Sequence, residues 1–216
     1  MTGPGLFVAF EGGEGAGKST QIERAARVLR ADGHEVLTTR EPGGTELGRE
    51  LRRLVLDPDG ADVSPRAEAL LYAADRAHHV ATVIRPALAA GTVVLTDRYV
   101  DSTLAYQGAG RGLSVEQARV LTGWATEGLL PDVTVLLDVD PAVGLTRAGA
   151  RSRLDRLESA SGAFHTAVRD GFRALAAADP GRYLVLDALR PADELGAEVA
   201  AELRQIGRAS CRERVC

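Results

Sequence analysis

Short apolar runs alternate along the chain with longer segments in which apolar residues recur at helical spacing. Residues 6–10 form an apolar run between glycines, and this pattern predicts a buried strand. Residues 19–31 repeat apolar positions at helical spacing from Ile22 to Leu29 and stop before Gly33, which predicts a helix. The chain therefore opens with a strand, a glycine-rich connection and a helix.

The same alternation continues to the end of the sequence. Further strands are predicted over residues 35–39, 92–97, 132–138 and 183–187. Helices are predicted over residues 45–56, 64–90, 114–126, 141–178 and 191–205, with a polar, Arg-rich break near 149–154. Strands that alternate with helices need crossover connections, and these give a mostly parallel sheet. We expect an α/β fold with five parallel strands and helices on both faces.

Composition and charge narrow the class of protein. Hydrophobic residues make up 45% and charged residues 26% of the 216 positions, as in an ordinary globular protein. The formal net charge of −4 argues against a nucleic-acid or acidic-membrane binder. No apolar stretch approaches the roughly 18 residues of a membrane span, and the first residues lack a secretory pattern. We expect a cytoplasmic protein with no nucleic-acid and no membrane partner.

The two cysteines lie near the end of the chain, at Cys211 and Cys216. The sequence therefore holds no disulfide framework, which suits a reducing compartment. No repeat or linker divides the rest, so we expect one domain over residues 1–205. Residues 206–216 change the character of the preceding helix, and one codon choice for them reads as a sequencing adapter. We expect this segment to be a non-native tail.

The clearest chemical signal is the glycine-rich loop at residues 12–19, which fits G-x-x-x-x-G-K-[ST] between a strand and a helix. Its glycines let successive N–H groups point at phosphate oxygens, and the helix N-terminus adds a partial positive charge. Only one of the 26 basic residues is a lysine, Lys18, whose compact ammonium suits the β- and γ-phosphates. The predicted nucleotide-binding residues are Gly12, Gly13, Glu14, Gly15, Ala16, Gly17, Lys18, Ser19 and Thr20.

A second signal lies at the end of the strand predicted over residues 92–97. This strand brings Asp97 to the carboxyl edge of the sheet, where ligands bind in such folds. The Ser19 hydroxyl and the Asp97 carboxylate are candidates to hold Mg²⁺, directly or through water. Arg98 is placed for a second phosphate, and a structural salt bridge between Asp97 and Arg98 is the alternative.

Several segments resemble the thymidylate kinase family. Residues 94–107 (VLTDRYVDSTLAYQ) resemble its signature, and similar segments stand at 10–20 (phosphate loop), 40–45 (REPGGT, acceptor side), 70–76 (LLYAADR, base) and 154–158 (LDRLE, lid). The resemblance implies the P-loop nucleoside monophosphate kinase fold with a short Arg-rich lid at about 147–158. It also implies phosphoryl transfer from ATP to dTMP in dTTP biosynthesis, with Mg²⁺, by a homodimer.

The resemblance assigns roles around the thymine base. Tyr72 would stack on the ring, Arg76 would hydrogen-bond its edge, and Thr103 and Gln107 would lie beside it. A core position for Tyr72, and ordinary helix-face positions for Thr103 and Gln107, are the plainer alternatives.

The same resemblance assigns roles around the sugar and phosphate. Arg98 would grip the dTMP phosphate, with Arg40 near the same acceptor. Tyr106 would crowd the 2′ position and disfavour ribonucleotides. Glu14 would lie close to the 3′-hydroxyl and the magnesium network.

Phosphoryl transfer also needs a cation on the transferring group. Some family members carry an arginine within the phosphate loop, and the matching position here is Gly15. Basic residues instead crowd the lid, at Arg147, Arg151, Arg153 and Arg156. Similarity to the bacterial subgroup with a glycine-bearing loop makes Arg151 the first candidate and Arg153 the second.

Two other functions stay open at this point. One is a P-loop kinase that phosphorylates another nucleoside monophosphate or a deoxynucleoside. The other is a regulatory switch that hydrolyses a nucleotide. Adjacent helix residues point about 100° apart, so we interpret His78 and His79 as helix-surface residues and not as a metal pair. We assign Trp124 to packing or an interface.

Overall fold

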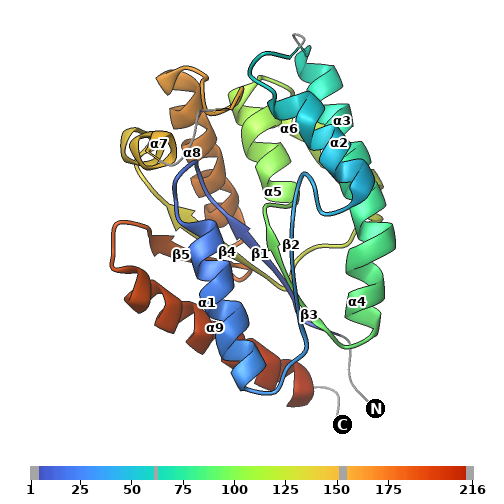
Figure 1. Ribbon diagram of the computed structural model, residues 1–216, viewed down its shortest axis with the longest axis vertical. Coiled ribbons are helices and arrows are strands. Elements are labelled where there is room, and N and C mark those ends of the chain that lie inside the picture. Colours follow the sequence, from blue (N-terminus) through green and yellow to red (C-terminus); the bar gives the residue numbers. More distant parts are fainter. Residues whose placement is uncertain (1–4, 61–62, 151–154, 213–216) are drawn as a thin grey trace.

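The computed structural model describes residues 5–60, 63–150 and 155–212 of the chain (Figure 1). The five strands form one sheet in the order β2-β3-β1-β4-β5, and every neighbouring pair is parallel. The strands are β1 (Phe7–Glu11), β2 (Val36–Arg40), β3 (Val93–Asp97), β4 (Val133–Asp138) and β5 (Tyr183–Asp187). The predicted five-stranded parallel α/β fold is confirmed.

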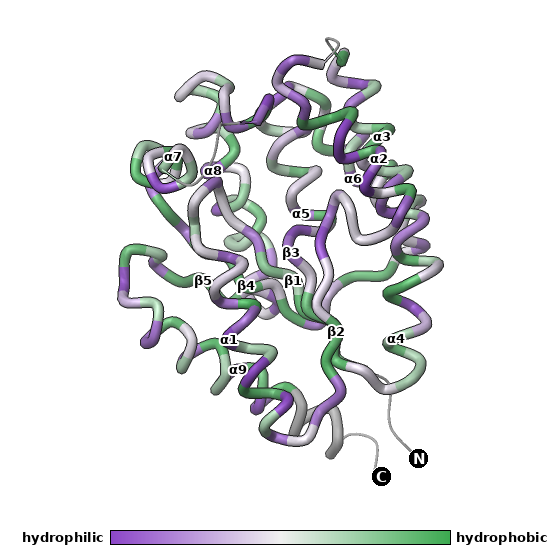
Figure 2. Tube along the Cα trace, in the orientation of Figure 1, coloured by the Kyte–Doolittle hydropathy of each residue, from purple (hydrophilic) through white to green (hydrophobic). Residues whose placement is uncertain are grey.

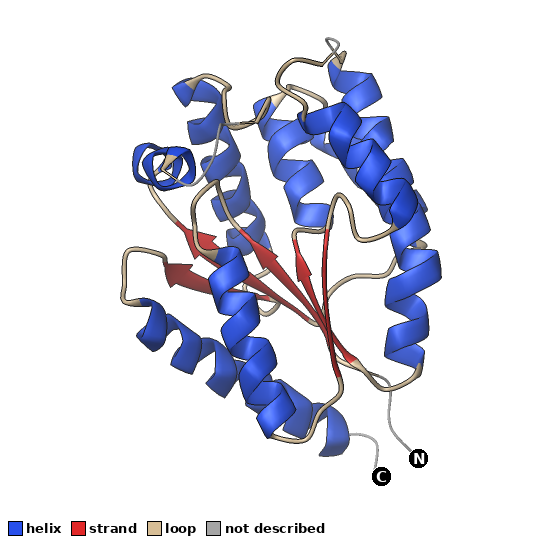
Figure 3. Ribbon diagram, in the orientation of Figure 1, coloured by secondary structure: helices blue, strands red, loops and turns tan. Residues whose placement is uncertain are grey.

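Helices cover both faces of the sheet, as Figures 1 and 3 show. They are α1 (Lys18–Ala31), α2 (Glu46–Leu56), α3 (Pro65–His79), α4 (Arg85–Ala89), α5 (Val100–Thr103), α6 (Val115–Thr126), α7 (Pro141–Gly149), α8 (Gly162–Ala178) and α9 (Ala192–Arg212), with π-helical turns η1 (Val80–Ile84) and η2 (Leu104–Gly110). Figure 2 shows hydrophilic and hydrophobic residues alternating along α9, as expected of a helix with one buried side. Within the described residues, no helix is long and apolar enough to cross a bilayer.

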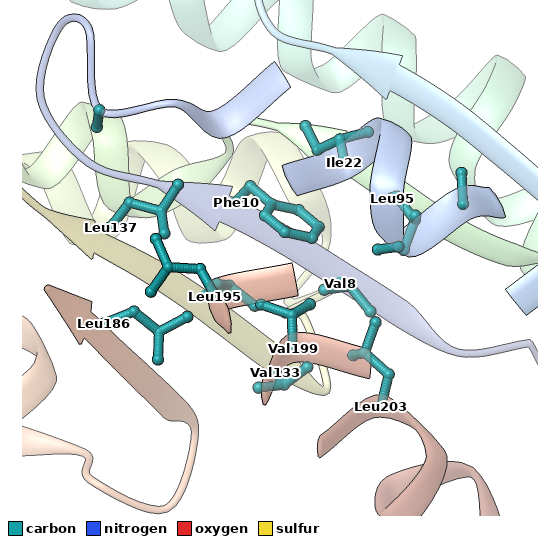
Figure 4. Close-up of a cluster of buried hydrophobic side chains, with 14 of the residues drawn as sticks. Val8, Phe10, Ile22, Leu95, Val133, Leu137, Leu186, Leu195, Val199 and Leu203 are labelled. Carbon is teal, nitrogen blue, oxygen red and sulfur yellow. The ribbon is translucent and has the colours of Figure 1, made fainter. Parts of the chain in front are cut away.

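The core follows the period-two alternation of the strands. In β1, Val8 and Phe10 face α1 and α9, whereas Phe7 and Ala9 pack with the residues around η1 on the other face. Figure 4 shows the first of these layers, in which strand residues meet apolar side chains of α9 and Ile22 of α1. A further cluster joins η2 to α8. Because both faces are packed, loops at the carboxyl ends of the strands are left to form a site.

The segment predicted as one helix over residues 64–90 is helical almost throughout. At η1, before Pro86, its backbone hydrogen bonds lengthen from the α-helical to the π-helical spacing. Proline lacks an N–H and its ring clashes with the carbonyl four residues earlier, so the turn before it opens. The Arg85 N–H accordingly bonds to the Val80 carbonyl, five residues back. On this helix His78 is exposed, but His79 is fully buried, so the surface interpretation was wrong for His79.

The sequence pattern assigned no helix to residues 100–110, where the structure has α5 and η2. Gly108 and Gly110 weaken the local helix signal, yet tertiary packing needs a glycine at position 110. A Cβ at Gly110 would lie 2.6 Å from the Phe164 ring, and one at Gly171 on α8 would lie 3.0 Å from Ala109. Close packing against α8 therefore stabilises a helix that intrinsic propensity does not predict.

Two helix limits also differ from the predictions. The described residues 155–161, between α7 and α8, are not helical, so the non-helical segment extends past the predicted break at 149–154. Ser161 ends it by accepting a hydrogen bond from the Phe164 N–H, which caps α8. Helix α9 continues to Arg212, past the predicted end at residue 205, because no proline interrupts it.

Candidate functional site

One cavity of about 290 Å³ opens at the carboxyl ends of β1, β2 and β3. Its walls come from the phosphate loop (residues 12–19), the segment after β2, helices α2 and α3, the α5–η2 segment and the described residues 155–158. Figure 3 shows the loops that leave the arrowheads of the strands at this edge. Segments that are distant in sequence thus meet at the place where a parallel sheet binds its ligands.

The phosphate loop turns sharply into α1, with Gly12 and Gly17 at positive φ of 135° and 94°. The Lys18 Nζ donates to the carbonyl oxygens of Gly12 and Gly13 at 3.1 and 3.0 Å, which holds the ammonium across the loop. Burial and the neighbouring Arg98 charge lower the pKa of Lys18. The N-terminus of α1 points its free N–H groups at the same space, so the loop has the geometry of an anion cradle.

Ser19 and Asp97 come together beside this loop, with the Ser19 hydroxyl donating to Asp97 Oδ2 at 3.3 Å. Mg²⁺ prefers oxygen ligands and is usually held by one or two protein groups together with substrate phosphates and water. A hydroxyl and a carboxylate at the edge of an anion cradle fit that requirement.

Gly15 lies where no other residue fits. Its φ is +63°, and a Cβ at this position would overlap the carbonyl oxygen of Gly144 on α7. A Cβ at Gly144 would in turn overlap the Glu14 carbonyl oxygen. The contact brings α7, which leads into the lid, directly against the loop, and it excludes any side chain at position 15.

Arg98 reaches into the cavity from a left-handed backbone with φ of 70°. Its Nη2 pairs with Glu14 at 2.7 Å, its Nη1 donates to Ser102 Oγ and the Gly12 carbonyl oxygen at 3.1 Å each, and its guanidinium lies over the Tyr106 ring. Arg98 therefore pairs with Glu14, and the alternative of a salt bridge to Asp97 does not describe it. A strained residue held by packing is a common feature of ligand sites.

Glu14 is the acceptor shared by Arg98 and Tyr106, whose hydroxyl donates to it at 2.6 Å. Burial acts to raise the pKa of Glu14, but the charges of Arg98 and Lys18 outweigh it and hold this pKa at about 2. Burial also raises the pKa of Tyr106, so its phenol keeps the proton that it donates. Below this layer, buried Glu11 accepts bonds from the Tyr99 and Ser102 N–H groups, which fixes the backbone that carries Arg98.

At the opposite wall, Arg76 is fully buried and each of its nitrogens is bonded. Nε donates to Glu41 at 2.7 Å, Nη1 to Thr103 Oγ1 at 2.8 Å, and Nη2 to the Tyr99 carbonyl oxygen at 2.9 Å. The second oxygen of Glu41 bonds with His79 Nδ1 at 2.9 Å, and His79 Nε2 bonds with Thr39 at 2.7 Å. The helix residues Arg76 and His79 thus anchor the REPGGT segment to α3.

Most of the predicted site residues come together in this cavity. Its lining includes Glu14, Gly15, Ala16, Gly17, Lys18, Ser19, Arg40, Tyr72, Arg76, Asp97, Arg98, Thr103, Tyr106 and Gln107. Gly12 and Gly13 lie behind it and hold Lys18 through their carbonyl oxygens, whereas Thr20 is exposed on α1 away from the lining. Arg151 and Arg153 lie outside the described residues.

The sequence reasoning gave no individual role to the other lining residues, although most of them lie within the segments that it singled out. They are Glu41, Pro42, Arg52, Leu56, Ser102, Ala148, Asp155, Leu157 and Glu158. Glu41 and Ser102 lie within the segments 40–45 and 94–107, so their place in those motifs was a signal for them. Nothing in its own segment distinguishes Arg52, which donates to the Pro42 carbonyl oxygen and enters the site only through the packing of α2 on α3.

Comparisons with known proteins identify a family. A family model described as thymidylate kinase matches residues 10–199. The chain is 58% identical over 201 residues to a thymidylate kinase of Leifsonia xyli, which covers 93% of this chain and 95% of that one. It is 57% identical over 203 residues to one of Deinococcus radiodurans, covering 94% and 98%. A crystal structure of thymidylate kinase from Ehrlichia chaffeensis matches with a TM-score of 0.76 at 31% identity, covering 93% of this chain and all of the other.

Proposed function

The chain belongs to the thymidylate kinase family, and on this premise we propose that it transfers the γ-phosphoryl group of ATP to dTMP, giving dTDP and ADP. The bond from the γ-phosphorus to the β,γ-bridging oxygen breaks, and a new bond forms to an oxygen of the dTMP phosphate. That oxygen is already anionic at neutral pH, so the reaction needs no general base. In the cell this step belongs to dTTP synthesis, and we place it in the cytoplasm.

One observation carries the proposal: the same cavity holds an anion cradle, the partly exposed Arg98 opposite that cradle, and space for a base. Lys18 and the N–H groups of the phosphate loop would hold the β- and γ-phosphates of ATP. Ser19 and Asp97 would hold Mg²⁺, which would neutralise charge on the phosphates when bound. Arg98 would hold the phosphate of dTMP in line with the donor, with Arg40 beside it.

The far end of the cavity suits the nucleoside. Tyr72 would stack on the base, while Arg76, Thr103 and Gln107 would contact its edge. Tyr106, held by Glu14, would close the space at the 2′ position and so disfavour ribonucleotides. Because Glu14 fixes Tyr106 and Arg98 together, it would align the sugar with the phosphate.

A lid cation would stabilise the transferring group, because position 15 admits no side chain. The two described lid arginines are bonded to protein: Arg147 donates to the Ala188 carbonyl oxygen, and Arg156 donates to the Val55 carbonyl oxygen and to Glu68. We therefore assign the catalytic charge to Arg151, with Arg153 second. Arg151→Ala should lower kcat far more than it raises either KM, and an unchanged kcat would remove Arg151 from the mechanism.

We further propose a homodimer formed through α2, α3 and α6, which pack against one another in this order. Trp124 is 81% exposed and lies one helical turn from exposed Val120, while Leu70 is exposed on α3. Exposed apolar groups of this size on adjoining helices indicate an interface. Trp124→Glu should convert the dimer to a monomer in light scattering coupled to size-exclusion chromatography. A wild-type monomer would contradict this assignment.

The decisive test of the function is ADP formation from Mg·ATP with dTMP, dUMP, dCMP, AMP, GMP and thymidine as acceptors. Strong stimulation by dTMP supports the proposed reaction and pocket. Greater activity with another acceptor would favour a different nucleoside monophosphate or deoxynucleoside kinase. Slow ADP formation that no acceptor stimulates, from folded protein, would favour a regulatory nucleotide switch.

A further inference from the structure

Glu68 is a fully buried carboxylate that the proposed reaction does not use. It lies near the start of α3, behind the base end of the cavity, and it is not part of the cavity lining. An ionised group is costly to bury unless it is paired and hydrogen-bonded, so its partners indicate what it does.

Its partners come from two segments on opposite sides of the pocket. From the η2 side, Gln107 Nε2 donates to Glu68 Oε1 at 2.9 Å, and Arg111 approaches both oxygens at 3.4 and 3.5 Å. From the lid side, Arg156 Nη2 donates to Oε2. Two arginines therefore balance the buried charge, and the only neutral partner is the amide of Gln107 among the described contacts of Glu68.

This contact fixes which way the Gln107 amide points. A carboxylate has acceptor atoms only, so it can bind the NH₂ branch of a carboxamide and not its oxygen branch. Gln107 is itself buried and lines the cavity. With Nε2 held by Glu68, the carbonyl oxygen is the branch that remains for a bound ligand.

The direction of this amide distinguishes pyrimidines. Thymine and uracil carry an N–H donor at ring position 3, whereas cytosine carries an acceptor nitrogen there. An oxygen presented at the base edge accepts a bond from the first pair and faces a lone pair of the second. A buried site that leaves polar groups unpaired rejects a ligand strongly.

We propose that Glu68 is a specificity-positioning residue, which holds Gln107 with its carbonyl oxygen toward the base and thereby selects N3–H pyrimidines over cytosine. The inference rests on the proposed function, because it concerns the same acceptor pocket. Glu68 acts through Gln107 and touches no substrate.

The test is the ratio of kcat/KM for dTMP to kcat/KM for dCMP. Glu68→Gln puts a side chain of the same shape there that can donate as well as accept, so Gln107 can reverse. We expect this ratio to fall by about tenfold or more, because one buried hydrogen bond to the base would no longer distinguish a donor from an acceptor. Glu68→Asp keeps an acceptor-only group and should retain more of the ratio than Glu68→Gln, even where kcat falls.

A double-mutant cycle separates positioning from general loosening of the fold. Gln107→Met removes the amide that Glu68 positions. In this background, Glu68→Gln should therefore leave the dTMP-to-dCMP ratio of kcat/KM unchanged. Arg111→Met is the matched control, since it removes an ion pair from the same carboxylate without changing the polarity of position 68, and should leave the ratio unchanged. Should E68Q not fold, E68Q/R156Q removes both charges and carries the same test.

The outcomes separate this inference from the function on which it rests. Wild-type protein without dTMP-stimulated ADP formation overturns the proposed function, and this inference with it. A wild-type preference for dTMP that E68Q or E68Q/R156Q leaves intact overturns the role of Glu68 only. An equal loss of ratio in Arg111→Met also overturns it, because general loosening would then explain the effect.

Discussion

Two arginines, the buried Arg76 and the partly exposed Arg98, line the same cavity and have different surroundings. Each nitrogen of Arg76 is bonded to protein, and its carboxylate partner Glu41 is itself bonded to His79. The Arg98 side chain keeps 17% of its surface exposed, extends from a left-handed backbone and pairs with the equally exposed Glu14. Arg76 is thus built into a closed network, whereas Arg98 is held at an open edge.

Because of this difference, one wall of the cavity is held rigidly by protein contacts, and another presents a charged group to the ligand. A guanidinium whose partners are all buried protein groups positions other residues and supports the fold. A guanidinium at the open edge remains available to a phosphate, for which its planar fork is suited. Substitutions at Arg76 should therefore affect stability first, and those at Arg98 should affect catalysis first.

The largest expected effect is on stability, at Arg76. Arg76→Met keeps much of the volume but leaves the Glu41 carboxylate buried without its cation, which should lower the free energy of unfolding by about 3–5 kcal/mol. Urea denaturation followed by circular dichroism measures the change. Arg66→Met, at an exposed position of the same helix, is the control and should stay within about 0.5 kcal/mol. Wild-type stability in Arg76→Met would contradict the proposed contrast between a structural Arg76 and a catalytic Arg98.

The second prediction concerns Arg98, where a substitution should lower activity and leave the stability of the fold nearly unchanged. Arg98→Lys keeps the charge beside Glu14 but loses the planar fork, so kcat/KM for dTMP should fall by about 100-fold. The unfolding midpoint in urea should change little, since the side chain is partly solvated. Steady-state kinetics and denaturation on the same preparation compare the two effects. A stability loss as large as that of Arg76→Met would show that both arginines are structural.

The fold was largely predictable because its signals are local. Buried parallel strands appear as short apolar runs, and the glycine-rich loop marks the first strand–helix junction. The helix over residues 100–110 was not predictable in this way, because Gly108 and Gly110 oppose helix formation and only close contact with α8 explains Gly110. The π-helical turn before Pro86 likewise depends on register within a long helix, which periodicity does not resolve.

The site was predictable where a motif carries its own chemistry. Lys18, Ser19 and Asp97 follow from a phosphate-binding pattern and the geometry of a parallel sheet, and most residues assigned by family resemblance line the cavity. The buried partners were not predictable. His79 looked like a surface residue, and Glu68 carried no motif, because their importance comes from contacts between segments that lie far apart in sequence.

A smaller effect should separate the two histidines that follow Arg76. His79 binds Glu41 and Thr39 through its two ring nitrogens, and His79→Gln cannot replace both bonds at once. We expect a loss of about 1–2 kcal/mol in unfolding free energy and a raised KM for dTMP, with KM for ATP unchanged. His78→Gln, at the exposed neighbour, should change neither quantity. Equal effects from both variants would show that the contribution of His79 to stability does not come from its bonds to Glu41 and Thr39.

The last expected effect depends on pH and concerns Asp75, which is buried beside the same network. Among the described residues its Oδ2 has no hydrogen-bond partner, and burial together with the nearby Glu41 charge raises the pKa of Asp75 to about 6. Between pH 4 and pH 6 the folded protein therefore binds more protons here than the unfolded chain, whose aspartates ionise near 3.8. Stability contributed by protonated Asp75 should fall as pH rises through this window.

Asp75→Asn removes that titration. From pH 4 to pH 7.5, the unfolding free energy of Asp75→Asn relative to wild type should rise by about 2 kcal/mol, whatever the absolute offset between them. Urea denaturation across this pH range measures the trend, with Asp170→Asn, at an exposed position on α8, as the matched control. Parallel curves for Asp75→Asn would mean that Asp75 is solvated in the folded protein. The network around Arg76 would then be open to water, as the surroundings of Arg98 are, and the contrast between the two arginines would narrow to their hydrogen-bond partners.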